Sequence, residues 1–319
     1  MSKYPQWTGQ LEYASVEIAY AAGRVEALVN TLGELDGELV ADSLISGDLR
    51  AEVVDGQVVI RPVEPLLFGR HGRRIPPRGL VANVCDPNRN FHLVQPTIDY
   101  AKRLYRLAES FSPGTNLLSY VAFETKCRAL LEQIKADRQL ANLLKGVHLP
   151  VCLPHLEVVD YGQALEEIFI PSVGRAYTLH LAKPFTNYRQ GELQGQVEIV
   201  DSSRHDRLLA RMAEEAVAGI YFPNPLQGYS VHAQREQMAT LPESFLLAGG
   251  LDTAAAWVMY PDVLARDGKT PGYNCSAVQW LSPGLSLYFK ARGGDAHFGL
   301  EGNLAGACDF YSGGLLFLG

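Results

Sequence analysis

The sequence predicts an α+β fold, and three observations support that class. Segments with helical periodicity interleave irregularly with strand-like segments, and the chain has no regular alternation of strand and helix. An Asp-Gly pair lies between two β-branched runs near residue 55. Two helical segments then follow one another before residue 146. We therefore expect an N-terminal helix and β-hairpin, a central αα-hairpin, and a C-terminal mixed sheet with interspersed helices.

Composition and length fit a folded protein with two domains. The 319 residues are 47% hydrophobic and 20% charged, far from the composition of disordered chains. The chain changes character after Gly146, so we expect domains at residues 1–146 and 147–319. No run of about 18 apolar residues suggests a membrane span, and no secretory signal is recognisable. With five scattered cysteines as free thiols, the expected location is the cytoplasm.

The N-terminal region begins with an amphipathic segment at residues 11–35. Its apolar residues recur at helical spacing, which fits a helix packed on its own domain or against another subunit: Ile18, Ala22, Val25, Val29 and Leu32. Residues 49–60 then predict a β-hairpin, because Asp55-Gly56 suits a type I′ turn.

The later elements follow from periodicity and caps. Pro96 opens a helix that ends before Pro113, with Ile98, Ala101, Leu104, Tyr105, Ala108 and Phe111 on one face. Thr115 is expected to cap a longer helix that closes at Gly146. Strands are expected at 147–153, 156–160, 175–182, 196–200, 276–281, 285–291, 297–300 and 315–318. Helices are expected from Ser202 or Ser203 through Ile220, at 231–241 and around 254–258.

Charge is distributed unevenly along the chain. Residues 1–60 carry three basic and ten acidic side chains, whereas residues 61–106 carry nine basic and three acidic ones. The whole chain has a net charge of −7, which makes nucleic acid an unlikely partner, because affinity for phosphate backbones comes mainly from positive charge. Opposed charge blocks suit contacts between subunits, so a homo-oligomer or larger assembly is expected.

The basic block contains a Pro- and Arg-rich loop that is a candidate binding site. Guanidinium groups bind carboxylates and phosphates bidentately, and nearby glycines let a ligand approach the backbone. The candidate residues are Arg70, His71, Arg73, Arg74 and Arg78.

A second candidate site is a cluster of metal-ligand residue types. His148, Cys152 and His155 lie within eight residues, with Asp160 beyond them. Imidazole and thiolate suit zinc, so zinc is the candidate cofactor. Isolated core or hydrogen-bonded side chains are the alternative interpretation.

Two shorter patterns do not reach a motif. Gly249-Gly250-Leu251-Asp252-Thr253 resembles an anion-binding helix start but has no P-loop lysine, so a plainly capped helix is expected. Gly228-Tyr229-Ser230-Val231-His232 has histidine where a nucleophile elbow needs a small residue.

Three functions therefore remain open. The first is a non-enzymatic structural or interaction subunit that uses the acidic surface of residues 1–60 and the basic surface of residues 61–106. The second is a metal-assisted hydrolase with its site near residues 148–160. The third is a phosphate or nucleic-acid binder acting through the Arg70–Arg78 loop.

Overall fold

The computed structural model describes residues 49–54, 57–62, 66–91, 93–112, 114–281 and 284–319. The chain forms two compact units, Met1–Pro65 and Leu66–Gly319. The helix expected over residues 11–35 lies outside the described residues. The domain boundary expected after residue 146 falls inside the second unit.

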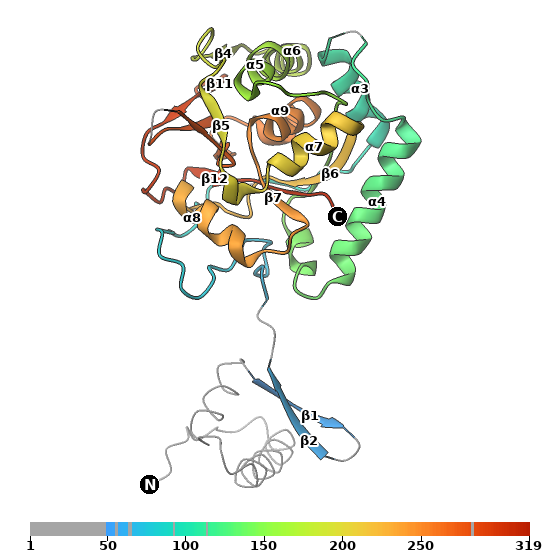
Figure 1. Ribbon diagram of the computed structural model, residues 1–319, viewed down its shortest axis with the longest axis vertical. Helices are drawn as coiled ribbons and strands as arrows, with labels where there is room; N and C mark the ends of the chain where they lie inside the picture. The colour runs from blue at the N-terminus through green and yellow to red at the C-terminus, as the bar shows by residue number, and fades with distance from the viewer. Residues whose placement is uncertain (1–48, 55–56, 63–65, 92, 113, 282–283) are drawn as a thin grey trace. The chain divides into compact units, whose positions relative to one another are not determined.

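The described part of the first unit is a β-hairpin. Strands β1 (Leu49–Val54) and β2 (Gln57–Pro62) are antiparallel, with Val54 opposite Gln57. Only Asp55 and Gly56 separate the strands, so the predicted hairpin is confirmed (Figure 1).

The second unit contains helices distributed along its whole length. They are α3 (Tyr100–Ser110), α4 (Tyr120–Ala136), α5 (Tyr161–Ala164), α6 (Ile170–Leu181), α7 (Asp206–Glu214), α8 (Val231–Glu236), α9 (Gly250–Met259) and α10 (Pro261–Leu264). One turn of π-helix, η2 (Leu165–Phe169), joins α5 to α6. Short 3₁₀ helices are η1 (Ala141–Lys145), η3 (Asp201–Ser203) and η4 (Gln237–Thr240).

Two larger sheets organise this unit. The four-stranded sheet has the order β3 (Leu149–Leu153), β6 (Val217–Phe222), β13 (Leu315–Phe317), β7 (Phe245–Leu247), and every pair is antiparallel. The five-stranded sheet has the mixed order β12 (Tyr311–Gly313), β8 (Gly272–Asn274), β10 (Ser286–Arg292), β11 (Asp295–Glu301), β4 (Phe185–Asn187). A separate ribbon pairs β5 (Val197–Ile199) with β9 (Val278–Trp280).

The core lies around the four-stranded sheet and helix α9. All residues of β3, β6, β7 and β13 are buried, and both α4 and α9 pack against β6 (Figure 1). Every residue of α9 is buried as well, as expected for a helix enclosed on all sides. Trp257 of α9 contacts the rings of Tyr273 and Phe289, so this helix also supports the five-stranded sheet.

The predicted pair of helices is present, but the helix boundaries differ from the predicted ones. Helices α3 and α4 are in contact, with the rings of Tyr100 and Phe123 5.7 Å apart. Helix α3 begins at Tyr100 rather than at Pro96. Helix α4 begins at Tyr120, capped by Ser119 rather than Thr115, and ends at Ala136 rather than at Gly146. The side chain of Ser119 accepts a hydrogen bond from the amide of Ala122.

Two strand predictions are wrong. The alternation of Tyr177, Leu179 and Leu181 predicts a strand over residues 175–182, but these residues belong mostly to α6. The buried positions of that helix follow helical spacing instead, and Leu179 is 58% exposed. Residues 156–160 form no strand.

The helix expected through Ile220 is too long. Helix α7 ends at Glu214, and Val217 begins β6. A continuous apolar run of six buried residues is typical of a strand covered on both faces, and this length distinguishes it from a helix.

The α+β class is confirmed by interleaved helices and mostly antiparallel sheets. Among the described residues, no helix has both the length and the apolar character needed to cross a bilayer.

Candidate functional site

The predicted arginine loop belongs to an extended segment over residues 66–99. Its described residues contain no helix and only isolated pairings, of Phe68 with Arg74 and of Val84 with Tyr229. Hydrogen bonds to the rest of the unit therefore hold this segment in place.

Arg74 points inward and is 3% exposed. Its guanidinium donates to the carbonyls of Leu67 and Ile75, both at 2.8 Å, to Gln237 Oε1 at 3.1 Å, and to Thr240 Oγ1 at 2.7 Å. Burial lowers the pKa of Arg74. These contacts attach the extended segment to η4.

Arg73 has a similar structural role. It donates to the carbonyls of Gln227 and Cys85, and its guanidinium carbon lies 5.7 Å from the ring centre of Tyr229. The other three candidates, Arg70, His71 and Arg78, are exposed. The structure therefore does not gather the five predicted residues into one site.

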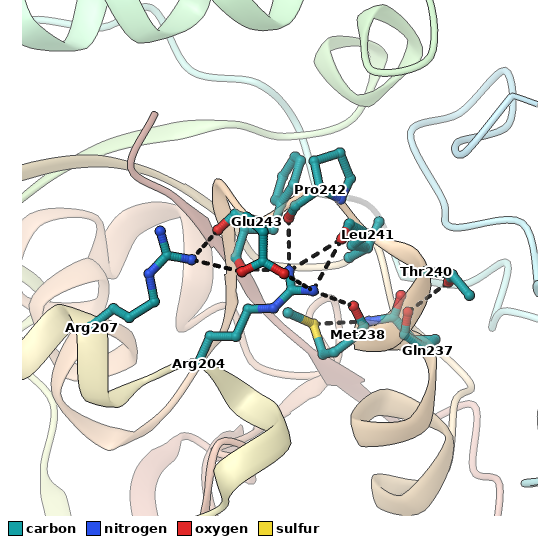
Figure 2. Close-up of polar contacts among 9 residues, drawn as sticks. Arg204, Arg207, Gln237, Met238, Thr240, Leu241, Pro242 and Glu243 are labelled. Carbon is teal, nitrogen blue, oxygen red and sulfur yellow. Dashed lines mark hydrogen bonds and ion pairs between the residues drawn. The ribbon is translucent and has the colours of Figure 1, made fainter.

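Arg204 also binds the segment around η4 that Arg74 contacts (Figure 2). Arg204 donates to the carbonyls of Met238, Leu241 and Pro242, and it forms an ion pair with Glu243 at 3.1 Å. Buried and half-buried guanidinium groups in this protein thus bind backbone carbonyls, which sequence alone does not reveal.

The four predicted metal ligands have separate partners. His148 Nδ1 lies 3.0 Å from the Gly146 carbonyl, and burial lowers the pKa of His148. Burial raises the pKa of the Cys152 thiol to about 11, and its Sγ lies 3.8 Å from the Leu153 carbonyl.

The other two have structural partners as well. His155 lies between Asn116 and the Ala213 carbonyl, at 3.3 and 3.1 Å. Asp160 caps α5 through the amide of Gln163 and also accepts from the amide of Gly195. In the part of the chain that the structure describes, no group of three or more His, Cys, Asp or Glu side chains could hold a metal ion.

A buried polar cluster caps α9, in agreement with the plain cap that the sequence predicts. The Tyr161 hydroxyl accepts from the amides of Gly250 and Leu251 at 2.8 and 3.2 Å, and it lies 3.0 Å from His205 Nε2. His205 Nδ1 lies 3.3 Å from the Leu247 carbonyl. A neutral His205 satisfies these contacts when Nε2 accepts a hydrogen bond from the Tyr161 hydroxyl and Nδ1–H donates to the Leu247 carbonyl.

Asp252 completes the cap. Its Oδ1 accepts from the amide of Gly249 at 2.8 Å, while Oδ2 has no hydrogen-bond partner among the described residues. Gly249 has no room for a side chain, because a Cβ there would lie 2.6 Å from the Tyr161 hydroxyl and 2.7 Å from His205 Nε2. The cluster has no room for a further group, so we interpret its contacts as structural.

Helix α3 carries a stripe of exposed side chains. Its exposed residues are Ala101, Lys102, Tyr105, Ala108 and Glu109, which share one helical stripe; we call this stripe the α3 face. Tyr105 is 65% exposed. The buried positions are Tyr100, Arg103, Leu104, Leu107 and Ser110, so the predicted apolar face is rotated from the true one.

The inward side of α3 is firmly fixed. Arg103 donates to the Met259 carbonyl at 2.9 Å and to both carboxylate oxygens of Asp262 at 2.6 and 3.0 Å. Arg106 also pairs with Asp262 at 2.6 Å. Burial alone would raise the pKa of Asp262, but its hydrogen bonds and charge interactions with Arg103 and Arg106 outweigh burial and lower it to about 2. The α3 face is therefore held on a rigid support.

A groove of about 790 Å³ runs beside the α3 face. One wall is α3, and the other is the segment that leads into α4, including Leu117, Leu118 and Tyr120. Tyr120 and the adjacent Val121 are 46% and 68% exposed. Exposed aromatic and aliphatic side chains gathered in this way are typical of protein–protein contact surfaces.

The charges of the α3 face oppose the dipole of their own helix. Lys102 lies in the first turn and Glu109 in the last; the acidic residue at the N-terminus is the N-cap Asp99, and the last turn has no basic residue. Anions are favoured at a helix N-terminus and cations at the C-terminus, by about 0.3–1 kcal/mol each. The sequence carries this signal, but it becomes visible only once the boundaries of α3 are known.

Comparisons with protein-family models, with curated protein sequences and with solved structures find no match for this chain.

Proposed function

We propose that this protein is a non-enzymatic subunit of a homo-oligomeric assembly and that a second copy binds along the α3 face. The observation that carries this proposal is the order of the exposed residues on α3, in which Lys102 and Glu109 lie at nearly equal distances on either side of Tyr105. Such an order is self-complementary when two identical helices meet antiparallel.

The geometry of an antiparallel pair accounts for each exposed residue. With a two-fold axis near Tyr105, Lys102 of each copy faces Glu109 of the other. Each charge then lies beside the favourable end of the opposite helix dipole. Ala101 and Ala108 allow the two helices to approach closely, because interaxial distance depends on the side chains at the contact.

The groove beside α3 supplies the apolar part of such a contact. Burying Tyr105, Tyr120 and Val121 removes apolar surface from water, which drives most protein association. Tyrosine is also enriched in the residues that dominate interface energies.

A contact through the α3 face would still form the expected assembly, but with charged residues other than those that the sequence predicts. Arg73 and Arg74 of the basic block bind internal carbonyls, so Lys102 of the same block is the better candidate for a contact between subunits. The acidic residues 1–48 lie outside the described residues. Five cysteines without disulfides support an assembly in the reducing cytoplasm.

The other two functions have less support. A metal-assisted hydrolase needs His148, Cys152, His155 and Asp160 together, and each has a separate partner. A phosphate binder needs free guanidinium groups, and those of Arg73 and Arg74 are already hydrogen-bonded.

A charge-reversal series tests the antiparallel contact. We expect Lys102→Glu and Glu109→Lys each to weaken self-association about tenfold or more, because each change places like charges together twice per dimer. The double variant Lys102→Glu/Glu109→Lys should restore association to within about threefold. Sedimentation velocity at several protein concentrations measures this.

The control is Arg70→Glu, a charge reversal at an exposed residue outside α3. It should leave association unchanged. A wild-type protein that stays monomeric up to about 100 μM, or a double variant no better than the single ones, would contradict the proposed contact.

A further inference from the structure

One face of the five-stranded sheet is polar and accessible, while the other is buried. On β10, Leu287, Phe289 and Ala291 are buried on the side of Trp257 in α9. Tyr288 and Lys290 point to the opposite face, since successive side chains of a strand alternate. We call this opposite face the tyrosine face.

A row of aromatic rings crosses the tyrosine face. The ring of Tyr188, just after β4, lies 5.4 Å from His297 on β11. His297 lies 5.7 Å from Tyr288 on β10, which lies 5.6 Å from Tyr311 on β12. Four rings from four strands or their ends therefore line up in contact.

Two glycines make room for the tyrosine rings. Gly299 is directly opposite Tyr288, and Gly272 is directly opposite Tyr311. A Cβ at Gly272 would lie 2.6 Å from the Tyr311 ring, and one at Gly299 would lie 3.0 Å from the Tyr288 hydroxyl. The two rings thus extend over the neighbouring strands and meet edge to face, at an interplanar angle of 76°.

The row ends at a pocket of about 130 Å³. Its lining includes Asn274, Glu301, Asn303 and Tyr311. At about 30 Å³ for each water molecule in the liquid, the pocket holds roughly four waters or a few hydroxyl-bearing atoms of a ligand.

Two buried oxygen atoms on this face have no hydrogen-bond partner among the described residues. They are Oδ1 of Asn274, a residue 4% exposed, and Oγ of the fully buried Ser286. Asn274 is directly opposite Tyr288, and Ser286 is directly opposite Glu301. Buried polar atoms are rarely left unpaired, and Asn274 also lines the pocket, so its Oδ1 points to a ligand that supplies donors. Ser286 is fully buried and is not part of the pocket lining.

The charges of the tyrosine face balance. Lys290 Nζ lies 4.1 Å from the centre of the Tyr311 ring, and Arg292 follows on the same face of β10. Glu301 and Asp295 of β11, opposite Ser286 and Arg292, carry the two negative charges. Burial is the main cause that lowers the pKa of His297, so this ring is neutral at pH 7. A face without net charge favours a neutral ligand over a polyphosphate.

We propose that the tyrosine face binds a neutral carbohydrate. A sugar ring would stack its C–H face on Tyr288, beside the edge-to-face contact of that ring with Tyr311. Its hydroxyl groups would donate to Asn274 Oδ1 and Glu301 in the pocket. Neighbouring sugar residues would extend along the row towards Tyr188. This assignment is independent of the contact proposed for α3.

A glycan array of neutral mono- to hexasaccharides tests this assignment with the full chain, and a twenty-nucleotide deoxythymidine strand is the second probe. We expect at least one neutral sugar to bind. In titrations of that sugar, Tyr288→Ala and Asn274→Leu should each weaken binding about tenfold or more, because each removes a stacking or hydrogen-bonding partner. Tyr288→Phe should retain most of the affinity.

The control is Val159→Ala, which truncates a 92% exposed apolar side chain outside both the five-stranded sheet and the α3 face. It should leave sugar affinity unchanged. Circular dichroism and thermal unfolding establish that each variant is folded. Binding of the deoxythymidine strand alone, with loss in Tyr288→Ala, would overturn the proposal in favour of nucleic acid. Absence of binding to every probe would also overturn it.

Discussion

His205 and Asp252 are fully buried titratable side chains whose pKa values shift in opposite directions. Burial lowers the pKa of His205 from 6.5 to about 4 and raises that of Asp252 from 3.8 to about 7. The stability from neutral His205 is fully present above pH 6.5 and is lost as pH falls towards 4. The stability from protonated Asp252 is present below pH 3.8 and is lost as pH rises through 7. Between pH 4 and 6.5 the two contributions oppose each other.

Replacing Asp252 with asparagine should therefore expose the His205 contribution. The amide mimics the protonated acid and can still accept from the amide of Gly249. We expect the unfolding free energy of Asp252→Asn, relative to wild type, to rise by about 4 kcal/mol between pH 4 and pH 7. Urea unfolding at a series of pH values measures this difference. Parallel curves for the two proteins would show that Asp252 does not titrate as described.

The partners of individual residues are the part that sequence reasoning could not supply. Arg73 and Arg74 stand out because arginines cluster there, but the groups that they bind include distant segments such as residues 225–240. The sequence does not indicate which backbone carbonyls bind an arginine, because every residue has a carbonyl. The same holds for Tyr161, whose hydroxyl caps α9 from nearly ninety positions away.

Two glycines in the continuous helix of residues 161–181 provide a matched test of packing at the scale of the element. A Cβ at Gly162 would lie 1.8 Å from the Leu193 carbonyl oxygen, whereas a Cβ at Gly174 would meet only Phe185 at 3.5 Å. We expect Gly162→Ala to destabilise the protein by about 2 kcal/mol or more. Gly174→Ala should be neutral or stabilising by up to about 1 kcal/mol, since alanine favours helices.

Urea unfolding of both variants checks this pair. Equal effects of the two changes would mean that the turn at Leu193 can move away from α5 without cost. The comparison isolates the close contact, because both substitutions add the same methyl group to the same helix.

Helices and strands were predictable where the apolar pattern was long or a turn signal was present. They were not predictable where a short apolar run fits both the helical and the strand spacing. The Asp-Gly hairpin and helices α3, α4 and α9 followed from their sequences. Residues 175–182 alternate like a strand, yet their burial against α3 and α9 selects a helix. Tertiary contacts of this kind override local preference.

At the scale of the whole molecule, self-association should stabilise the fold by mass action. A partner that binds only the folded state raises the unfolding temperature as protein concentration rises. We expect the thermal midpoint of the wild type to increase by several degrees between about 1 and 100 μM, and that of Lys102→Glu to stay nearly constant. Differential scanning fluorimetry at a series of concentrations measures both. A wild-type midpoint independent of concentration would argue against the α3 contact.

The two proposed surfaces needed the assembled fold before they could be recognised. Tyr188, His297, Tyr288 and Tyr311 are scattered over more than a hundred positions, and only the order of the strands brings them into one row. The α3 face required knowledge of which side of the helix is covered. The sequence located the charged and aromatic residues, and strand order and helix packing decided which of them act together.

The position of β13 has a consequence for synthesis of the chain. Residues 315–317 lie between β6 and β7 and pair with both, although those two strands come much earlier in the sequence. Each therefore leaves the ribosome with an unpaired edge that stays open until translation has passed residue 317. Open edges can pair with other nascent chains, so rapid insertion of residues 315–317 should reduce aggregation of newly made protein.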